Sequence, residues 1–252
     1  MRKIERRPLP AAADRFLRRK QSELDAEGNG AHAATLWGKA RKTVALRATL
    51  VVLGQMARER QRCMFCEDSH GTDIDHFWPK SKYPRRTFDW VNLLLVCARC
   101  NRAKGQSFPL DDRGEPLLID PTAEDPWAFL FYDSVTGNLA PRYRPDGCPE
   151  PKGVTTIKSL PLRHETITEG RLRSQRQMKR AVAAFLAEST AAPHGKAKAR
   201  LAEELHQAVR DSDDCGLGQW FFCKDGQQSE PFATLRRTHP TVWQELQQLV
   251  TR

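Results

Sequence analysis

Apolar residues recur at helical spacing through the first sixty residues of the chain, among arginine, lysine and glutamine. This stripe is formed by Trp37, Val44, Leu46, Leu50, Leu53 and Met56. An apolar stripe with a period near 3.6 residues is typical of a helix that packs one face against a core. We therefore predict that residues 1–60 are helical, with Gly28-Asn29-Gly30 separating a shorter helix from the main one.

The pattern changes between Cys63 and Pro109, where cysteines, aromatic residues, prolines and short apolar runs follow one another. The segment VNLLLVC at 91–97 is the most strand-like or buried part of this region. The segment ARCNRAKG at 98–105, which follows it directly, is predicted to begin a helix. This region is therefore the compact centre of the chain.

The rest of the chain is predicted to be helical after two short strands. The candidate strands are Leu117–Ile119 and Ala128–Tyr132, and the turn signal Thr136-Gly137-Asn138 follows them. Pro193-His194-Gly195 interrupts the helical pattern that comes next. The predicted helices run from about Arg163 to Glu188, Lys196 to Asp211 and Thr241 to Leu249.

These patterns predict an α+β protein with three regions. Residues 1–60 form an N-terminal helical region, 61–115 the compact centre, and 116–252 a region of short strands and helices. A chain of 252 residues is long enough to bury a substantial core, so we expect a stable globular fold.

Charge and hydropathy limit the partners and the location that we expect for the protein. Lysine and arginine number 41 against 31 aspartates and glutamates, a formal net charge of +10 that favours polyanions such as nucleic acid as partners. No apolar run approaches the roughly eighteen residues needed to cross a bilayer. The opening MRKIERR leads into prolines and alanines and not into the apolar core of a signal peptide. We expect a cytoplasmic protein without a membrane partner.

Four of the seven cysteines form two Cys-x-x-Cys pairs. Cys63 and Cys66 precede Cys97 and Cys100 with thirty residues between the pairs. Because disulfides are rare in the cytoplasm, this spacing favours a four-thiolate zinc site over a disulfide framework or two unrelated pairs of buried thiols. Such a site is closed and structural, so it cannot itself activate water. The roles of the other cysteines stay open; these are Cys148, Cys215 and Cys223.

Acidic, imidazole and amide side chains lie between and beside the cysteine pairs. Hydrolysis of a phosphodiester needs a divalent cation and a base near neutral pH. Asp75 supplies a hard oxygen ligand, Asn101 a second one, and His76 the base. An amide or backbone carbonyl near Asn92 can hold the other ring nitrogen of the imidazole. Asp73 shares a strand face with Asp75, and we leave it outside the site as a candidate supporting acid.

Residues 63–105 resemble the HNH nuclease family through CMFC, DIDHFWPKS and WVNLLLVCARCNRAKG. The resemblance implies a ββα-metal fold, in which a two-stranded hairpin and a helix surround one catalytic metal ion. It also implies that Asp75 and Asn101 are metal ligands, that His76 is the general base, and that Asn92 orients it. Asn101 stands where the family often has histidine, and this harder ligand favours Mg²⁺ or Mn²⁺. We thus expect a zinc-stapled HNH core flanked by helical regions.

Basic residues interleave with aromatic residues just after the Asp-His pair. They favour phosphate contacts with aromatic support, although a run of charges is also typical of a solvated face. The predicted nucleic-acid contacts are Lys80, Lys82, Arg85, Arg86 and Lys104. DNA is the expected substrate, and RNA or tRNA stays open.

A wider resemblance covers most of residues 1–175, through MRKI, LLIDPTAEDPWAFLFYD and TIKSLPLRHETITEGR together with the nuclease segment. These stretches are similar to the PtuB-type HNH proteins of bacterial anti-phage systems, Septu and some retrons. The chain departs from that family at Leu162-Arg163-His164, where the family favours Leu-Asn-Arg. The resemblance implies an antiviral nuclease governed by an ABC- or SMC-like ATPase of the PtuA type. One apolar stripe of the C-terminal helices is a candidate docking surface, but such stripes usually pack into the core.

The alternative from another class is a zinc-stabilised module that binds nucleic acid or a partner without cutting. Asp75-His76 together with Asn101 argues against this alternative, because a binding module needs no base beside a hard-metal ligand. A zinc-dependent deaminase is disfavoured too, because its His-x-Glu beside Pro-Cys-x-x-Cys is missing from the sequence.

Overall fold

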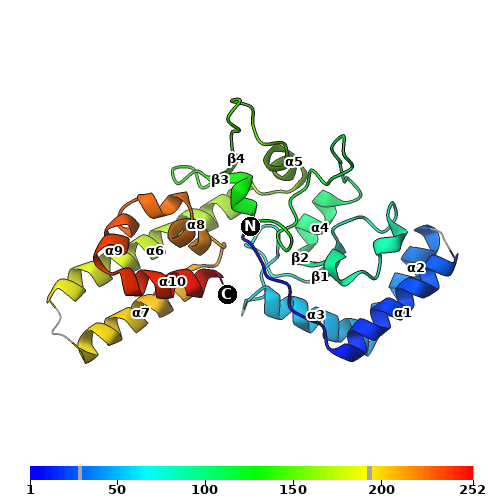
Figure 1. The fold of residues 1–252 in the computed structure, drawn as a ribbon, viewed down its shortest axis with the longest axis horizontal. Helices are drawn as coiled ribbons and strands as arrows, with labels where there is room; N and C mark the ends of the chain where they lie inside the picture. Colours follow the sequence, from blue (N-terminus) through cyan, green and yellow to red (C-terminus); the bar gives the residue numbers. More distant parts are fainter. Residues whose placement is uncertain (28–29, 59, 192–194, 252) are drawn as a thin grey trace.

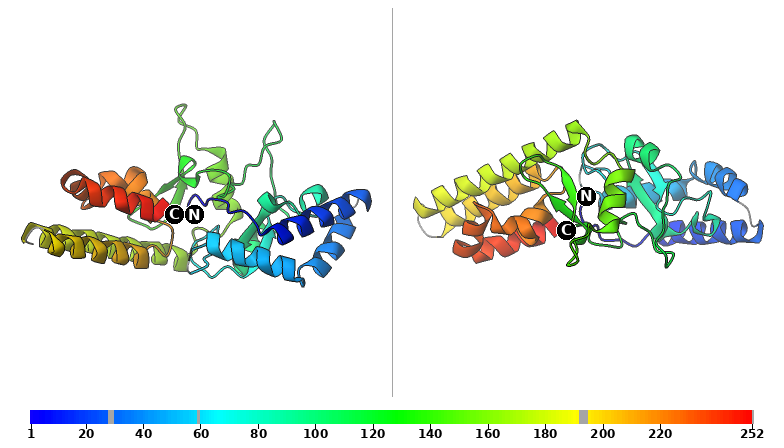
Figure 2. Two further views of the ribbon diagram at one scale, coloured as in Figure 1. Left: turned by 60° about the horizontal axis from the view of Figure 1, so that its bottom comes forward. Right: turned by 90° about the horizontal axis from the view of Figure 1, so that it is seen from above.

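The computed structural model describes residues 1–27, 30–58, 60–191 and 195–251. In two further views the molecule is elongated, with helices α1–α3 at one end and α6, α7, α9 and α10 at the other (Figure 2). The β1–β2 hairpin and α4 lie between them (Figure 1). The mixture of helices and small sheets confirms the predicted fold class. The division into regions at residues 60 and 115 stays a prediction.

Three helices make up the N-terminal region: α1 (Ala11–Glu27), α2 (Gly30–Ala40) and α3 (Val44–Met56). The side chain of Thr43 caps α3 by accepting a hydrogen bond from the backbone N–H of Leu46 at 3.4 Å. Residues 1–10 are not helical, so the prediction is wrong there. Proline lacks the N–H that a helix interior needs, and Pro8 and Pro10 stand in this segment. Residues 28 and 29 of the predicted glycine break lie outside the described residues.

The centre is a two-stranded antiparallel sheet followed by a short helix. Strand β1 (Asp73–His76) pairs with β2 (Leu93–Val96), and Asp75 lies opposite Leu94. Helix α4 (Ala98–Lys104) follows β2 directly. Every residue of β2 is buried, because the hairpin packs between α3 and α4. The predicted strand and helix of this region are therefore confirmed.

The segment after α4 contains a second hairpin, of β3 (Leu130–Tyr132) and β4 (Leu139–Pro141), and then α5 (Pro151–Ser159). Gly137, at φ 75°, makes the turn between the strands as predicted. The strand predicted at Leu117–Ile119 is wrong. Its backbone N–H groups bond singly to unrelated partners, the carbonyl of residue 109 and the hydroxyl of residue 156. The run is apolar because its side chains are mostly buried. Among the described residues it pairs with no strand.

The C-terminal helices are α6 (Glu165–Ala191), α7 (Lys196–Ser212), α8 (Gly218–Cys223), α9 (Phe232–Thr238) and α10 (Pro240–Thr251). The three predicted helices correspond to α6, α7 and α10, whereas α8 and α9 were not predicted. Residues 193 and 194 of the predicted break lie outside the described residues. Met178, Val182, Leu205, Val209 and Leu246 are buried, so most of the predicted apolar stripes face the core. Within the described residues, we find no helix with the length and apolar character of a membrane span.

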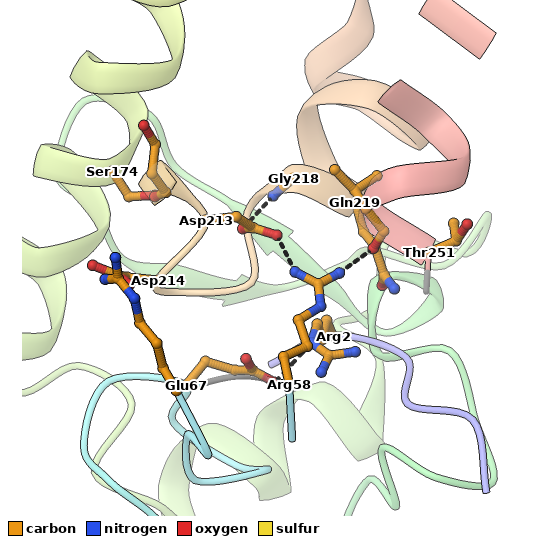
Figure 3. Close-up of polar contacts among 12 residues, drawn as sticks. Arg2, Arg58, Glu67, Ser174, Asp213, Asp214, Gly218, Gln219 and Thr251 are labelled. Atoms are coloured by element: carbon orange, nitrogen blue, oxygen red, sulfur yellow. Dashed lines mark hydrogen bonds and ion pairs between the residues drawn. The ribbon is translucent and has the colours of Figure 1, made fainter. Parts of the chain in front are cut away.

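Partly buried ionic contacts join the C-terminal helices to the loop after α3 (Figure 3). The carboxylate of Asp213 accepts hydrogen bonds from Arg58 Nη1 at 2.6 Å and from the backbone N–H of Gly218 at 2.8 Å. Arg58 also donates to the carbonyl of Val250 in α10. One carboxylate thus ties the end of α7, the start of α8 and the loop after α3 together.

The first seven residues run through the same junction. Arg2 is buried and forms an ion pair with Glu67 at 3.5 Å. The backbone of Lys3 exchanges two hydrogen bonds with the Gln219 side chain, at 2.9 and 3.0 Å. Arg6 donates to backbone carbonyls at and just before the start of β2. This segment therefore connects the central sheet to α8.

We predict that Asp213→Ala lowers the free energy of unfolding by about 2–3 kcal/mol, because it leaves the Arg58 guanidinium and a backbone N–H without their acceptor. Asp214→Ala is the matched control. Its ion pair with Arg60 is more exposed, with side chains 33% and 49% accessible, and its loss changes stability by less than about 1 kcal/mol. Urea unfolding of both variants measures the difference, and equal effects would contradict the prediction.

Candidate functional site

The four cysteines of the two predicted pairs converge at one point. Their Sγ atoms all lie within 4.8 Å of one another, and those of Cys66 and Cys97 are 3.9 Å apart. A tetrahedral zinc ion with Zn–S bonds of about 2.3 Å places its sulfurs roughly 3.8 Å apart. All four side chains are buried, and burial raises the pKa of the Cys63 thiol well above its usual value. The cluster therefore fits a zinc ion, whose charge would favour the thiolate forms.

The cluster links three parts of the centre. Cys63 and Cys66 stand in the loop after α3, and the intervening Met64 donates its N–H to the β2 carbonyl of Leu95 at 2.9 Å. Cys97 directly follows β2 and caps α4, because its sulfur accepts the Cys100 N–H at 3.4 Å. A zinc ion here would fix α4 against the hairpin.

A cavity of about 430 Å³ opens beside β1 and α4. Its lining includes three of the predicted site residues, Asp75, His76 and Asn101. Lys80 and Asp73 line it as well, the latter against the expectation that it lies outside the site. Helices α2 and α3 supply the rest of one wall, through Trp37, Arg41, Leu46, Arg47 and Leu50. The acid, imidazole and amide side chains therefore share one cavity.

His76 is held in a neutral and defined state. Its side chain is buried, its ring lies 4.4 Å from the Trp37 ring, and its Nε2 is 3.0 Å from the carbonyl oxygen of Thr87. Burial, together with the positive charge of Lys80, lowers the pKa of His76 to about 3. Because a carbonyl only accepts, Nε2 carries the proton and Nδ1 keeps its lone pair. The imidazole is thus arranged as a proton acceptor.

Asn92 acts on His76 through the loop and not by direct contact. Its amide oxygen accepts the Trp78 N–H at 2.7 Å, and its amide nitrogen donates to the carbonyls of Trp78 and Arg86 at 3.1 and 2.8 Å. Arg86 immediately precedes Thr87, whose carbonyl holds the imidazole. Asn92 thus holds the loop on which the Thr87 carbonyl lies, and its role in orienting His76 stays a prediction.

Lys104 is an internal cation. Its side chain is 1% exposed, and its Nζ lies 2.6 Å from the His76 carbonyl oxygen and 3.0 Å from Asp75 Oδ2. The contact with Asp75 is an ion pair. Burial raises the pKa of Asp75, and the positive charge of Lys104 opposes this rise. Lys104 is thus unavailable to nucleic acid in this structure, and its predicted role there is wrong.

Asp73 and Asn101 form a pair on the same side of the cavity. Asn101 Nδ2 donates to Asp73 Oδ2 at 3.0 Å, which leaves the amide oxygen of Asn101 as a free acceptor. With Asp75, this arrangement offers hard oxygen donors of the kind that Mg²⁺ and Mn²⁺ prefer. Side chains alternate along a strand, so residues 73 and 75 share one face, and this pattern could have placed Asp73 in the predicted site.

The other predicted nucleic-acid contacts lie on the loop between β1 and β2. Lys82, Arg85 and Arg86 are exposed there, while Lys80 lines the cavity. The Arg86 guanidinium lies over the Trp78 ring, 4.3 Å from its centroid. The neighbouring aromatic rings largely pack among themselves or in the core. A role for this loop in binding nucleic acid stays a prediction.

Comparison with known proteins shows similarity in the central region of the chain. Residues 61–107 match the family model described as HNH endonuclease. The chain is also similar to the Septu protein PtuB of Bacillus thuringiensis, with 33% identity over 97 residues. This match covers 36% of the chain and 33% of PtuB, so it spans about a third of that relative's length. The predicted HNH and PtuB-type resemblance is confirmed.

We predict that the purified protein contains one zinc ion per chain and that Cys97→Ser loses it and unfolds the centre. Structural zinc can contribute on the order of 10 kcal/mol to folding, more than the short hairpin can replace. Elemental analysis and hydrogen exchange over residues 61–107 measure the two effects. Cys148→Ser, at an exposed cysteine, is the control and keeps both zinc and protection. Folded wild-type protein without zinc would refute the assignment.

Proposed function

Because residues 61–107 match the HNH endonuclease family model, we propose that the protein is a metal-dependent nuclease that hydrolyses phosphodiester bonds in DNA. The observation that carries the proposal is the shared cavity of His76, Asp75 and Asn101. It combines a neutral imidazole whose Nδ1 is free with oxygen donors for a hard cation. A binding module without cleavage activity has no use for this combination.

Asp75 and Asn101 would hold Mg²⁺ or Mn²⁺, and such a cation would supply stabilisation of the charge that develops on the scissile phosphate and the leaving oxygen. His76 Nδ1 accepts the proton of the water that attacks phosphorus, while Nε2–H stays bonded to the Thr87 carbonyl. That carbonyl also stabilises the imidazolium that forms.

A pKa of about 3 makes the resting imidazole a weak base. A general base is most effective when its pKa lies near the working pH. The negative charge of a bound phosphate raises the pKa of a nearby imidazole, because it favours the protonated form. The charge of a bound phosphate therefore opposes the lowering of the His76 pKa that burial, Lys80 and a bound cation cause.

Two further residues keep this geometry in place. Lys104 joins the Asp75 carboxylate to the His76 backbone, so the acid and the imidazole cannot shift independently. Asn92 holds the loop whose Thr87 carbonyl orients the ring. Both act on catalysis through position, since neither faces the cavity.

The formal charge of +10 supports a nucleic-acid substrate. No base-reading motif is visible in the sequence, so we propose cleavage with little sequence preference. DNA is the proposed substrate, and RNA or tRNA of matched sequence is the comparison that tests the choice.

The similarity to PtuB supports a role as the nuclease effector of an anti-phage defence system, in a Septu or retron setting. A nuclease with little sequence preference needs restraint in its host. We propose that an ABC- or SMC-like ATPase of the PtuA type supplies it. The apolar stripes of α6, α7 and α10 mostly pack inward, which leaves only a small part of them for a docking surface.

We predict that His76→Ala lowers the rate of plasmid nicking by about a hundredfold to ten-thousandfold, because the general base is lost. The assay compares Mg²⁺, Mn²⁺ and EDTA, and circular dichroism verifies that the variant is folded. His164→Ala, at an exposed histidine far along the chain, keeps full activity. Unchanged nicking by His76→Ala would show that another group is the base.

Asp75→Ala distinguishes loss of metal from loss of the base. It is expected to be equally inactive, but calorimetric titration with Mn²⁺ should show weakened metal binding only in this variant. Retained Mn²⁺ affinity would remove Asp75 from the ligand set.

We predict that co-expression with the product of an adjacent ATPase gene yields a complex whose nuclease activity depends on ATP. Size-exclusion chromatography and nicking assays with and without ATP measure this directly. Separate elution together with equal cleavage in every condition would identify a free-standing nuclease.

A further inference from the structure

The N-terminal helices build one wall of the cavity that holds His76. Trp37 of α2 touches the imidazole edge-on, with ring centroids 4.4 Å apart. Leu46, Arg47 and Leu50 of α3 also line the cavity, as does Arg41 in the turn between the helices. The HNH match does not include this wall, since it begins at residue 61, after the end of α3.

Two arginines of this wall are exposed and are not engaged by acids. Within the described residues, neither Arg41 nor Arg47 forms an ion pair, and Arg47 makes only a long contact to the Lys42 carbonyl at 3.5 Å. The carboxylates of the cavity have other partners: Asp73 bonds Asn101 and Asp75 pairs with Lys104. These two guanidinium groups are thus available to an external anion.

The charge balance of the cavity favours such an anion. Arg41, Arg47 and Lys80 contribute three positive charges among the lining residues, and Asp73 and Asp75 contribute two negative ones. The net charge is +1 before any divalent cation binds, because His76 is neutral. The other exposed basic residues predicted to bind nucleic acid lie on the β1–β2 loop and do not line the cavity.

We propose that Arg41 and Arg47 bind the DNA backbone phosphates that flank the scissile phosphate, so that the α2–α3 wall positions the substrate strand over His76. The proposal rests on the proposed nuclease function and assigns its substrate-positioning residues. Arginine suits this role because its planar guanidinium donates two parallel hydrogen bonds to phosphate oxygens. The N-terminal helices are then part of the substrate site and not only a support for the core.

The test measures binding separately from cleavage. Arg41→Gln and Arg47→Gln are combined in a His76→Ala background, and the affinity for a fluorescein-labelled duplex is measured by anisotropy over a range of salt concentrations. The plot of log affinity against log salt has a negative slope. Each lost phosphate contact reduces the magnitude of this slope by about 0.9 on duplex DNA and about 0.7 on a single strand. We expect the double variant to lose about 1.8 on the duplex, since two contacts disappear. Single-stranded DNA and RNA of the same sequence form the other arms.

The matched control is Arg236→Gln with Arg237→Gln, which removes the same charge from α9 at the other end of the molecule (Figure 1). Its slope is expected to equal that of the parent. All four substituted arginines are exposed. Thermal unfolding verifies that each variant is folded. Equal slopes for the Arg41/Arg47 variant and the parent, equal losses in both double variants, or no binding to any probe would overturn the proposal.

Kinetics in the wild-type background separate this proposal from the nuclease function itself. The Arg41/Arg47 variant should raise KM more than it lowers kcat, and Arg→Lys at both positions should restore part of the loss. If the wild type cleaves DNA but the Arg41/Arg47 substitutions leave the salt slope unchanged, the proposed role of the two arginines is refuted and the proposed nuclease function stands. A reduced slope without any wild-type cleavage would keep the wall as a binding surface and refute the nuclease.

Discussion

The convergence of four thiols is the constraint on which the central architecture depends. A hairpin of two four-residue strands is marginal in water, and α4 adds only seven residues. The cysteine cluster joins the loop after α3, the end of β2 and the start of α4 at one point. Since β1 carries Asp75 and α4 carries Asn101, the distance between the two proposed ligands depends on a cluster that lies outside the cavity.

Burial determines the protonation of the site. The pKa of His76 is lowered and that of Asp75 is raised by the same loss of solvent, so burial alone favours two uncharged groups. Lys104 opposes this for the carboxylate, because its ammonium group is only 3.0 Å away. Lys104 therefore favours the charged form of Asp75, whereas the positive charges of Lys80 and Lys104 add to the preference of His76 for its neutral form.

The chemistry of the site was predictable from local sequence, whereas its surroundings were not. Cysteine pairs and an Asp-His dipeptide can be recognised from residues that are close in sequence. The structure brings these residues together as the motif suggests. The burial of Lys104 and the indirect action of Asn92 depend on how α4 and the loop fold onto β1. Leu117–Ile119 failed as a strand because a short apolar run signals burial without specifying a hydrogen-bonding partner. Arg41 and Arg47 gave no signal, since only tertiary packing places them beside His76.

The segment formed by residues 1–7 has a consequence for synthesis of the chain. Lys3 bonds to Gln219, a partner 216 residues later, while Arg6 bonds to carbonyls at the start of β2. A contact of such long sequence separation forms only after α8 has left the ribosome. The packing of residues 1–7 between the central sheet and α8 is therefore complete only after residue 219 has been synthesised, although the central sheet itself is made much earlier.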